Sequence, residues 1–454
     1  MQDRMDVISL IRKHATRNPR QKAYCDGVAE NSLTYAELIR RADAVAESLR
    51  NRGCQPGDRC GLLMPEGGEF LVSALGILIA RLCVAPIGVF VPQAEIDFVI
   101  EASQLHWFLL SDSKLVRFPL ASPVDESDDK DFRACDPAYI RFTSGSTGRR
   151  KGVLLGHSTI LERLVAANDL LKIGSQDNVW FNLPMADHFI VSTLLYLSRG
   201  ATILSPKKSY LWPAAAQQAT VVYGDPGFYR ELIKSDISNL DSARLVISTT
   251  APLPSQVAAE FLEKFAIPLN PALGMIELGL LTINFRRDKC DSVGIMMPAY
   301  KATILNENNL VRIGQTGELQ INGPGLLDAY LAPWRPKSKL LGTHGFPTGD
   351  YARFDAEGYL FLLGRGKNRI TLGSVQFFCE EIESILNGLP GIDESRVYLD
   401  SGILSAELVG PLNSTDWIAE SLETKLESAK IPTIFKIVSS LPRTPNGKIS
   451  RIIE

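Results

Sequence analysis

Cysteine ligand patterns, long apolar runs and an excess of basic charge are all missing from this chain of 454 residues. The cysteines form no CxxC pair and no Cys/His spacing typical of a metal site, which predicts reduced thiols in a cytoplasmic protein. A formal net charge of −3 predicts no nucleic-acid partner and no polybasic membrane anchor. No secretory signal is expected, because residues 1–20 carry charges throughout and lack an apolar core.

The most apolar stretch, residues 70–92, is interrupted by Arg81 and Pro86. This pattern predicts a buried helix followed by a buried strand, and no membrane span. Residues 35–52 place apolar side chains at helical spacing and stop at Gly53, which predicts an amphipathic helix. The acidic residues 125–131 are expected to form a solvated loop.

Short apolar segments alternate with helical patterns at residues 61–64, 179–181, 201–204, 220–222 and 245–247. Such alternation is typical of α/β proteins, in which helices cover both faces of doubly wound parallel sheets. After residue 295 the strand-rich pattern predicts a small β-barrel-like part or a twisted sheet. A Gly-rich charged junction at residues 364–367 predicts a large N-terminal domain, 1–364, and a small α+β C-terminal domain, 365–454.

Residues 143–152, with the sequence TSGSTGRRKG, have the composition of a phosphate-binding loop between two strands. Glycines let the backbone approach a polyphosphate, hydroxyl and N–H groups donate hydrogen bonds, and Lys151 supplies a positive charge. The loop is not a Walker A motif, because Lys151 is followed by Gly152 instead of Ser or Thr. A mobile surface loop rich in glycine and serine is the alternative interpretation.

Several segments, taken in order, resemble the adenylate-forming superfamily, which includes acyl-CoA synthetases, adenylation domains of nonribosomal peptide synthetases and firefly luciferase. They are residues 33–38 (LTYAEL), 143–152, 274–277 (GMIE), 316–319 (TGEL), 348–350 (TGD), 364–365 (GR) and 441–449 (LPRTPNGKI). The resemblance implies that ATP and Mg²⁺ activate a small carboxylic acid to an acyl-adenylate, with release of pyrophosphate. It also implies transfer of the acyl group to the thiol of CoA or of a carrier protein's phosphopantetheine, and a mobile C-terminal domain.

Roles for individual residues follow from the resemblance. The nucleotide would be bound by Thr143, Ser144, Gly145, Ser146, Thr147, Gly148, Lys151, Gly274, Met275, Ile276, Asp350 and Arg365. Glu277 would bind Mg²⁺, and Lys448 would bridge the substrate carboxylate and the α-phosphate as the chief catalytic residue. Lys367 would be the hinge between two domain arrangements.

The chain departs from the family pattern at several positions. Arg150 replaces a proline, Leu273 replaces an aromatic residue that stacks on adenine, and Ile276 replaces a threonine. Ser374, preceded by Gly373, stands where a glycine is usual in the segment that lines the thiol tunnel. The resemblance therefore supports adenylation more strongly than thiol transfer.

The predicted substrate pocket comprises Asp187, His188, Thr249, Thr250, Ala251, Leu273 and Gly274. His188 would act as a catalytic residue that orients the substrate or gates the tunnel, or it would pack at a helix end. Residues 183–186 resemble the aryl-acid-activating branch, whereas Asp187 falls where amino-acid-activating domains hold the substrate ammonium. We predict a free-standing enzyme for a small aromatic acid, with three alternatives: an amino-acid-activating enzyme, a catalytically weakened binding protein on the same fold, and a phosphotransferase.

Overall fold

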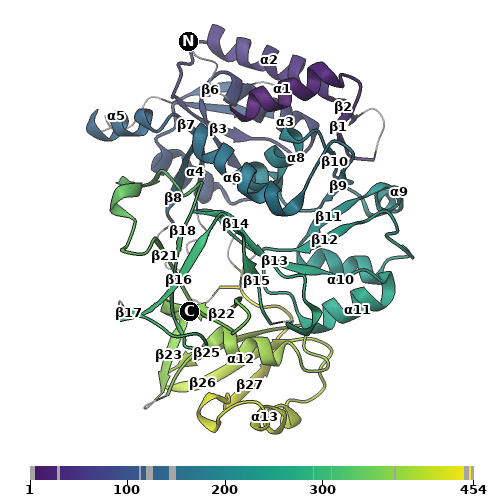
Figure 1. Ribbon diagram of the computed structural model, residues 1–454, viewed down its shortest axis with the longest axis vertical. Helices are drawn as coiled ribbons and strands as arrows, with labels where there is room; N and C mark the ends of the chain where they lie inside the picture. The colour runs from purple at the N-terminus through teal and green to yellow at the C-terminus, as the bar shows by residue number, and fades with distance from the viewer. Residues whose placement is uncertain are drawn as a thin grey trace.

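The computed structural model describes residues 6–27, 31–111, 114–118, 126–142, 150–289, 291–307, 309–372, 375–443 and 449–450. Two large sheets and their helices form the upper part of the molecule in Figure 1, and a smaller α+β part lies below them. The fold is therefore the mixed α/β architecture with doubly wound sheets that the sequence predicts. No described helix is both long enough and apolar enough to cross a membrane.

The first large sheet is parallel in its centre. Its described strands, from edge to edge, are β20 (Arg335–Pro336), β19 (Ala329–Leu331), β8 (Gly152–Gly156), β7 (Pro137–Phe142), β4 (Cys83–Ile87), β3 (Arg59–Leu63), β5 (Trp107–Leu110) and β6 (Leu115–Arg117). Strands β7 and β8 pair antiparallel, with Phe142 opposite Gly152. The predicted phosphate loop therefore leaves and re-enters the sheet at the same end of two neighbouring strands.

The second large sheet joins a parallel half to an antiparallel half. Its described strands, from edge to edge, are β17 (Asn309–Leu310), β16 (Lys301–Asn306), β18 (Gly317–Asn322), β21 (Phe346–Phe354), β22 (Tyr359–Arg365), β15 (Gly294–Met296), β14 (Gly279–Ile283), β13 (Asn270–Met275), β12 (Leu245–Ser248), β11 (Val221–Gly224), β9 (Asn178–Phe181), β10 (Thr202–Leu204), β1 (Lys22–Cys25) and β2 (Leu33–Thr34). Strand β13 pairs parallel with β12 and antiparallel with β14. Of the strands after residue 295, β16, β17, β18, β21 and β22 therefore extend this sheet, whereas β19 and β20 join the first sheet.

The helices of the large part are α1 (Val7–Arg17), α2 (Tyr35–Asn51), α3 (Gly68–Ile79), α4 (Gln93–Ser103), α5 (Glu126–Ala134), α6 (His157–Leu171), α7 (Met185–His188), α8 (Leu194–Ser198), α9 (Trp212–Gln218), α10 (Pro226–Lys234) and α11 (Ser255–Phe265). The predicted amphipathic helix is α2. Thr34 and Glu37 form its capping box, and Gly53 follows its end with φ +90°. Residues 33–38, one of the segments that resemble the family, therefore comprise strand β2 and the first turn of α2.

Apolar side chains alternate between two cores along the parallel strands. Trp180 and Val222 pack into the core beneath α9, α10 and α11, whereas Phe181 and Val221 face the core between the large sheets. A parallel strand covered on both faces needs apolar residues at every position, which explains the short continuous apolar runs.

The prediction of a solvated loop at residues 125–131 is wrong. Helix α5 begins at Glu126 there and runs to Ala134. The guanidinium of Arg59 lies 4.0 Å from the centre of the buried Phe132 ring, and Arg133 pairs with Asp129 one turn earlier at 2.7 Å. The helix is thus stabilised by a distant arginine, and local charge gave no sign of it.

The C-terminal part has a core of its own. Its elements are β23 (Arg369–Leu372), β24 (Val375–Phe378), α12 (Cys379–Leu386), β25 (Glu394–Asp400), β26 (Ile403–Val409), α13 (Asp416–Glu423) and β27 (Ile434–Ile437). Ile382, Leu408 and Leu422 lie in this separate core. The boundary at residues 364 and 365 stays a prediction, which the separate core supports.

Candidate functional site

The predicted pocket segments lie at the carboxyl ends of strands of the second sheet. Helix α7 follows β9, residues 249–251 follow β12, and Leu273 lies in β13. Backbone hydrogen bonds tie the strand ends together: Asn182 N donates to Tyr223 O at 2.9 Å, and Thr249 N donates to Gly224 O at 3.0 Å. Ligands of open α/β sheets bind outside the carboxyl ends of the strands, and the predicted residues lie at that edge.

Glu277 is held beside the end of the predicted phosphate loop through Tyr330. The Tyr330 hydroxyl donates to Glu277 Oε1 at 2.9 Å, and Lys151 Nζ lies 4.8 Å from the centre of the Tyr330 ring. Tyr330 is in β19, opposite Val153 of β8. The structure thus brings Lys151 and Glu277 to the same side chain, which the sequence did not reveal.

The Glu277 carboxylate fits a Mg²⁺ ion that also binds phosphate oxygens. Mg²⁺ is usually held by one or two carboxylates together with substrate phosphates, so a dedicated cage of side chains is not needed. Within the described ranges, no cluster of three or more His, Cys, Asp or Glu side chains could hold a metal. The phenol of Tyr330 carries no charge, because burial and the neighbouring Glu277 charge raise its pKa above the ordinary value.

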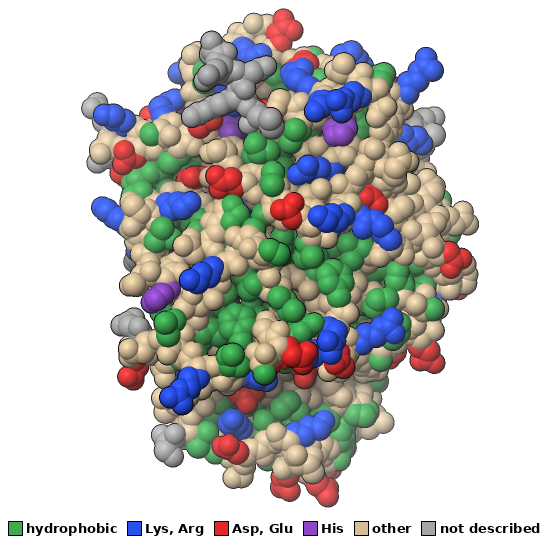
Figure 2. All heavy atoms as spheres, in the orientation of Figure 1, with side chains coloured by type: hydrophobic (Ala, Val, Ile, Leu, Met, Phe, Trp, Pro, Cys, Tyr) green, Lys and Arg blue, Asp and Glu red, His purple; other side chains and the backbone are tan. Residues whose placement is uncertain are grey.

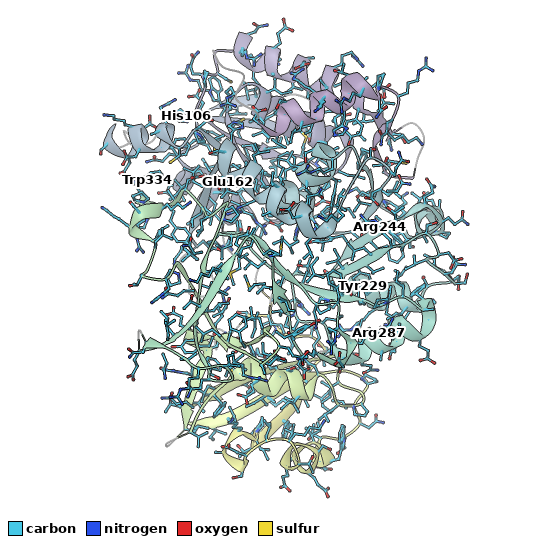
Figure 3. All side chains as sticks on the ribbon, in the orientation of Figure 1. His106, Glu162, Tyr229, Arg244, Arg287 and Trp334 are labelled. Carbon is cyan, nitrogen blue, oxygen red and sulfur yellow. The ribbon has the colours of Figure 1, made fainter. Side chains whose placement is uncertain are left out.

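Two charged residues of α6, the buried Arg163 and the exposed Glu162, bind the backbone at Ile276, next to Glu277, and at Gly325. Arg163 is 2% exposed; its Nε donates to Gly325 O at 2.5 Å and its Nη1 to Ile276 O at 2.7 Å. Glu162, labelled in Figure 3, accepts a hydrogen bond from Gly325 N at 2.7 Å. Burial lowers the pKa of Arg163 to about 10, so it stays charged at neutral pH. These contacts position the segment that carries Ile276 and Glu277.

Asp350 and Arg365, both predicted to contact the nucleotide, lie opposite each other on β21 and β22. Arg365 Nε and Asp350 Oδ1 are 2.6 Å apart, with the Asp350 side chain 10% exposed and that of Arg365 49% exposed. Gly349 has φ +74°, which favours glycine just before Asp350. Asp350 is therefore a buried acceptor whose guanidinium partner is half in solvent.

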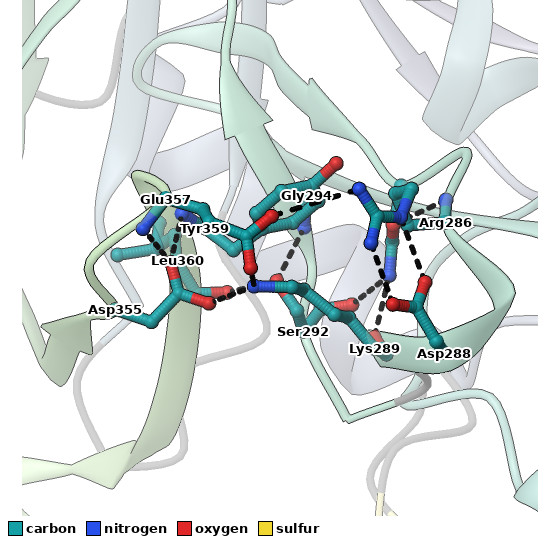
Figure 4. A network of polar contacts seen from close by, with 10 residues as sticks. Arg286, Asp288, Lys289, Ser292, Gly294, Asp355, Glu357, Tyr359 and Leu360 are labelled. Carbon is teal, nitrogen blue, oxygen red and sulfur yellow. Dashed lines mark hydrogen bonds and ion pairs between the residues drawn. The ribbon is translucent and has the colours of Figure 1, made fainter.

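A second charged network lies at the other end of the same hairpin (Figure 4). Lys289 pairs there with Asp355, and its Nζ is 2.7 Å from Glu357 Oε1. Arg286 pairs with Asp288 at 2.6 Å. These carboxylates neutralise cations of residues 286–289, so they have a structural role and provide a comparison for Asp350.

Helix α7 carries Asp187 and His188 and is held by β7. Arg141 Nη2 lies 3.2 Å from Asp187 Oδ1, and Arg141 Nη1 also donates to the Asp187 carbonyl. His188 is the last residue of α7, and its ring centre lies 6.3 Å from that of Phe181. The helix-end position matches the packing alternative for His188, and its catalytic role stays a prediction.

The remaining pocket residues differ in exposure. Thr249 is buried, Thr250 is exposed with φ +74°, and Ala251 is exposed. Leu273 is half-buried, and Gly274 is exposed beside it. Met275 and Ile276 are half-buried at the end of β13. Their contacts with substrate or nucleotide stay predictions.

Several predicted residues lie outside the described residues: Thr143, Ser144, Gly145, Ser146, Thr147, Gly148, Gly373, Ser374 and Lys448. Arg150, at the loop end, forms an ion pair with Glu95 of α4 and lies 5.9 Å from the Phe98 ring centre. Its charge therefore serves to attach the loop end to α4. On either side of residues 444–448, Arg443 and Ile449 form an antiparallel bridge, and Ser450 N donates to Pro442 O at 2.7 Å.

The predicted hinge residue, Lys367, lies in a short 3₁₀ turn, Gly366–Asn368, directly after β22. Gly364 has φ +152°, and a side chain there would meet that of Phe378 at 2.8 Å. Arg230 of α10 donates to Asp393 O of the C-terminal part at 2.7 Å. The two parts are therefore in direct contact, and the hinge role of Lys367 stays a prediction.

Sequence reasoning missed Tyr330, Arg163 and Arg141. Each acts on a residue far along the chain, so motif spacing carries no sign of it.

Comparison with known proteins defines the class. A family model for AMP-binding enzymes matches residues 11–331, which is more than half of the chain. The chain therefore belongs to the family of AMP-binding enzymes. Its fold matches that of ATP-bound MatB from Rhodopseudomonas palustris, with a TM-score of 0.83 and 26% identity over 98% of this chain and 97% of that one.

Relatives of two kinds are similar to this chain. Tyrocidine synthase 3 of Brevibacillus parabrevis is 27% identical over 97% of this chain, which spans 8% of that protein's length. Feruloyl-CoA synthase of an Amycolatopsis species is 25% identical over 92% of both proteins.

Proposed function

We propose that this protein uses ATP and Mg²⁺ to convert a small carboxylic acid into an acyl-adenylate and then transfers the acyl group to a thiol. The observation that supports the proposal most directly is the arrangement of Lys151, Tyr330 and Glu277 at the end of the loop between β7 and β8. This arrangement supports the proposal because a cation and a carboxylate able to bind Mg²⁺ lie beside one side chain at the end of that loop. MatB, which was solved with ATP, and feruloyl-CoA synthase support the same chemistry by similarity.

In the first half-reaction, a substrate carboxylate oxygen attacks the α-phosphorus of ATP. The bond from that phosphorus to the bridging oxygen breaks, and pyrophosphate leaves with the electron pair. Both reactants are anions, so fixed positive charge must hold them together. In this proposal Lys151 contacts the outer phosphates and Lys448 contacts the substrate carboxylate and the α-phosphate. Glu277 would hold Mg²⁺, which when bound would supply further positive charge beside the phosphates.

In the second half-reaction, a thiolate attacks the acyl carbon and AMP leaves. The thiol belongs to CoA or to the phosphopantetheine of a carrier protein. Lys367 would serve as the hinge that changes the domain arrangement between the half-reactions.

For the substrate we propose an aromatic acid. Phe181, beside His188, stacks on Tyr223 with ring centres 6.2 Å apart, and Tyr196 lies 6.1 Å from Phe181. These three rings are buried in the core beside α7, so they support the helix that carries His188 and do not themselves face a ligand. The choice of an aromatic acid is supported by the similarity to feruloyl-CoA synthase.

Exchange of radiolabelled pyrophosphate into ATP tests the proposal, with a panel of aryl, fatty and amino acids. We expect exchange that depends on an aryl acid and on Mg²⁺. Exchange with amino acids only would overturn the aromatic substrate and favour an amino-acid-activating enzyme. No acid-dependent exchange would overturn adenylation and favour a binding protein, whereas steady formation of ADP would favour a phosphotransferase.

A further inference from the structure

Helix α7 is attached to β7 by two side chains of alternate residues, which point to the same face of the strand. The Tyr139 hydroxyl donates to Ala186 O at 3.2 Å, and Arg141 Nη1 donates to the next carbonyl, that of Asp187. Both donors lie in β7, the strand that leads into the predicted phosphate loop, and both therefore fix the backbone of α7.

Arg141 does more than hold the backbone, because it also pairs with the Asp187 carboxylate. Arg141 Nη2 lies 3.2 Å from Asp187 Oδ1, with the side chains 23% and 36% exposed. The planar fork of the guanidinium contacts the carbonyl and the carboxylate together. The negative charge of Asp187 is therefore compensated from within the protein.

We propose that Arg141 is a specificity-determining residue: by cancelling the charge of Asp187, it makes the pocket select acids that carry no ammonium group beside the carboxylate. This inference rests on the proposed function. An ammonium group needs an uncompensated acceptor to replace its hydration shell. In this pocket it would meet Asp187 together with a guanidinium of its own charge, and like charges at an interface are strongly unfavourable.

The test compares two substrates that differ only in the ammonium group, 3-phenylpropanoate and phenylalanine, in pyrophosphate exchange. The measured quantity is the ratio of their kcat/KM values. The wild-type protein should favour 3-phenylpropanoate. Arg141→Leu should shift the ratio toward phenylalanine by about tenfold or more, because Asp187 is then uncompensated.

Two further variants separate charge from structure. Asp187→Asn keeps the carbonyl that Arg141 binds and leaves the guanidinium uncompensated, so the ratio should move the opposite way, further toward 3-phenylpropanoate. Arg141→Lys keeps the charge, so the ratio should stay near that of the wild type. If the Arg141–Asp187 pair had a purely structural role, Arg141→Leu and Asp187→Asn would shift the ratio of kcat/KM values in the same direction. Thermal unfolding of each variant shows whether it is folded.

The outcomes separate this inference from the proposed function. If the wild type exchanges with no acid at all, the proposed function is wrong and this inference is overturned with it. If the wild type exchanges with 3-phenylpropanoate but Arg141→Leu leaves the ratio unchanged, only the specificity role is overturned. Fast wild-type exchange with a dicarboxylic acid that is lost in Arg141→Leu would also overturn it, because Arg141 would then bind a second substrate carboxylate.

Discussion

The carboxylates of the candidate site have different partners at its two proposed ends, the nucleotide end with Glu277 and Asp350 and the acid end with Asp187. At the nucleotide end, the partner of Glu277 is a neutral phenol, and the partner of Asp350 is a half-exposed arginine. At the acid end, Asp187 is bound through both its carboxylate and its carbonyl by Arg141. A carboxylate whose partner is neutral or half in solvent keeps more of its charge for a ligand than one whose partner is a mostly buried guanidinium that also binds its backbone carbonyl.

Charges of both signs are mixed on the visible surface of the molecule. The face shown in Figure 2 carries basic and acidic side chains interspersed, without a large area of one sign. Recognition of an anionic nucleotide therefore depends on local pairing within the site. Changes to single partners should accordingly have distinct effects at the two ends.

The largest effect is expected from Lys448→Ala, which removes the cation proposed to connect the two ends. Acid-dependent pyrophosphate exchange should fall by about 10²–10³-fold, because the substrate carboxylate and the α-phosphate lose a shared positive charge. Thiol transfer from a preformed acyl-adenylate should remain largely intact. Lys436→Ala, which alters an exposed lysine of the same C-terminal part, is the matched control. Equal loss of both half-reactions would contradict the role of Lys448.

The next effect is expected from Asp350→Asn at the nucleotide end. The KM for ATP should rise by about tenfold, because a charged acceptor worth about 1.5–3 kcal/mol per hydrogen bond is replaced by a neutral one. Asp355→Asn is the matched control, since Asp355 follows the same strand and pairs with Lys289 (Figure 4). An equal rise in both variants would show that Asp350 has only a structural role in the hairpin.

A smaller effect is expected from Tyr330→Phe, which removes the hydrogen bond to Glu277 and keeps the ring beneath Lys151. The Mg²⁺ concentration for half-maximal exchange should rise by about tenfold, the lower bound for loss of a group that orients a metal ligand. Removal of Mg²⁺ with EDTA should abolish exchange in both proteins. Tyr300→Phe is the control, because the Tyr300 hydroxyl donates to the Leu278 carbonyl at 3.1 Å and does not contact the Glu277 carboxylate. Identical Mg²⁺ requirements for wild type and Tyr330→Phe would contradict this role.

The sequence could predict short motifs and strands, but it could not predict the partners of the site residues. Short segments with a fixed chemistry, such as Gly274 to Glu277 and Thr348 to Asp350, indicated the nucleotide end, and alternating apolar residues indicated the strands. The partners that decide the charge state were not predictable. Tyr330 reaches Glu277 only because β19 pairs with β8, and Arg141 reaches Asp187 only because α7 packs against β7. Helix α5 was missed for the same reason, because its stabilising partner Arg59 is on β3.

The smallest effect concerns pH and tests whether the partner of Glu277 is neutral. Burial and the Glu277 charge raise the pKa of Tyr330 above its ordinary value of about 10. The phenol should then stay protonated from about pH 7 to about pH 9.5, so the Mg²⁺ requirement of Tyr330→Phe relative to wild type should not change over this range. Above about pH 10 the unfolded chain loses this proton while the folded protein keeps it, so this tyrosine lowers the free energy of unfolding as pH rises. If the ratio of the Mg²⁺ requirement of Tyr330→Phe to that of the wild type instead fell to one below about pH 9.5, Tyr330 would be ionised in that range. The partner of Glu277 would then no longer be neutral.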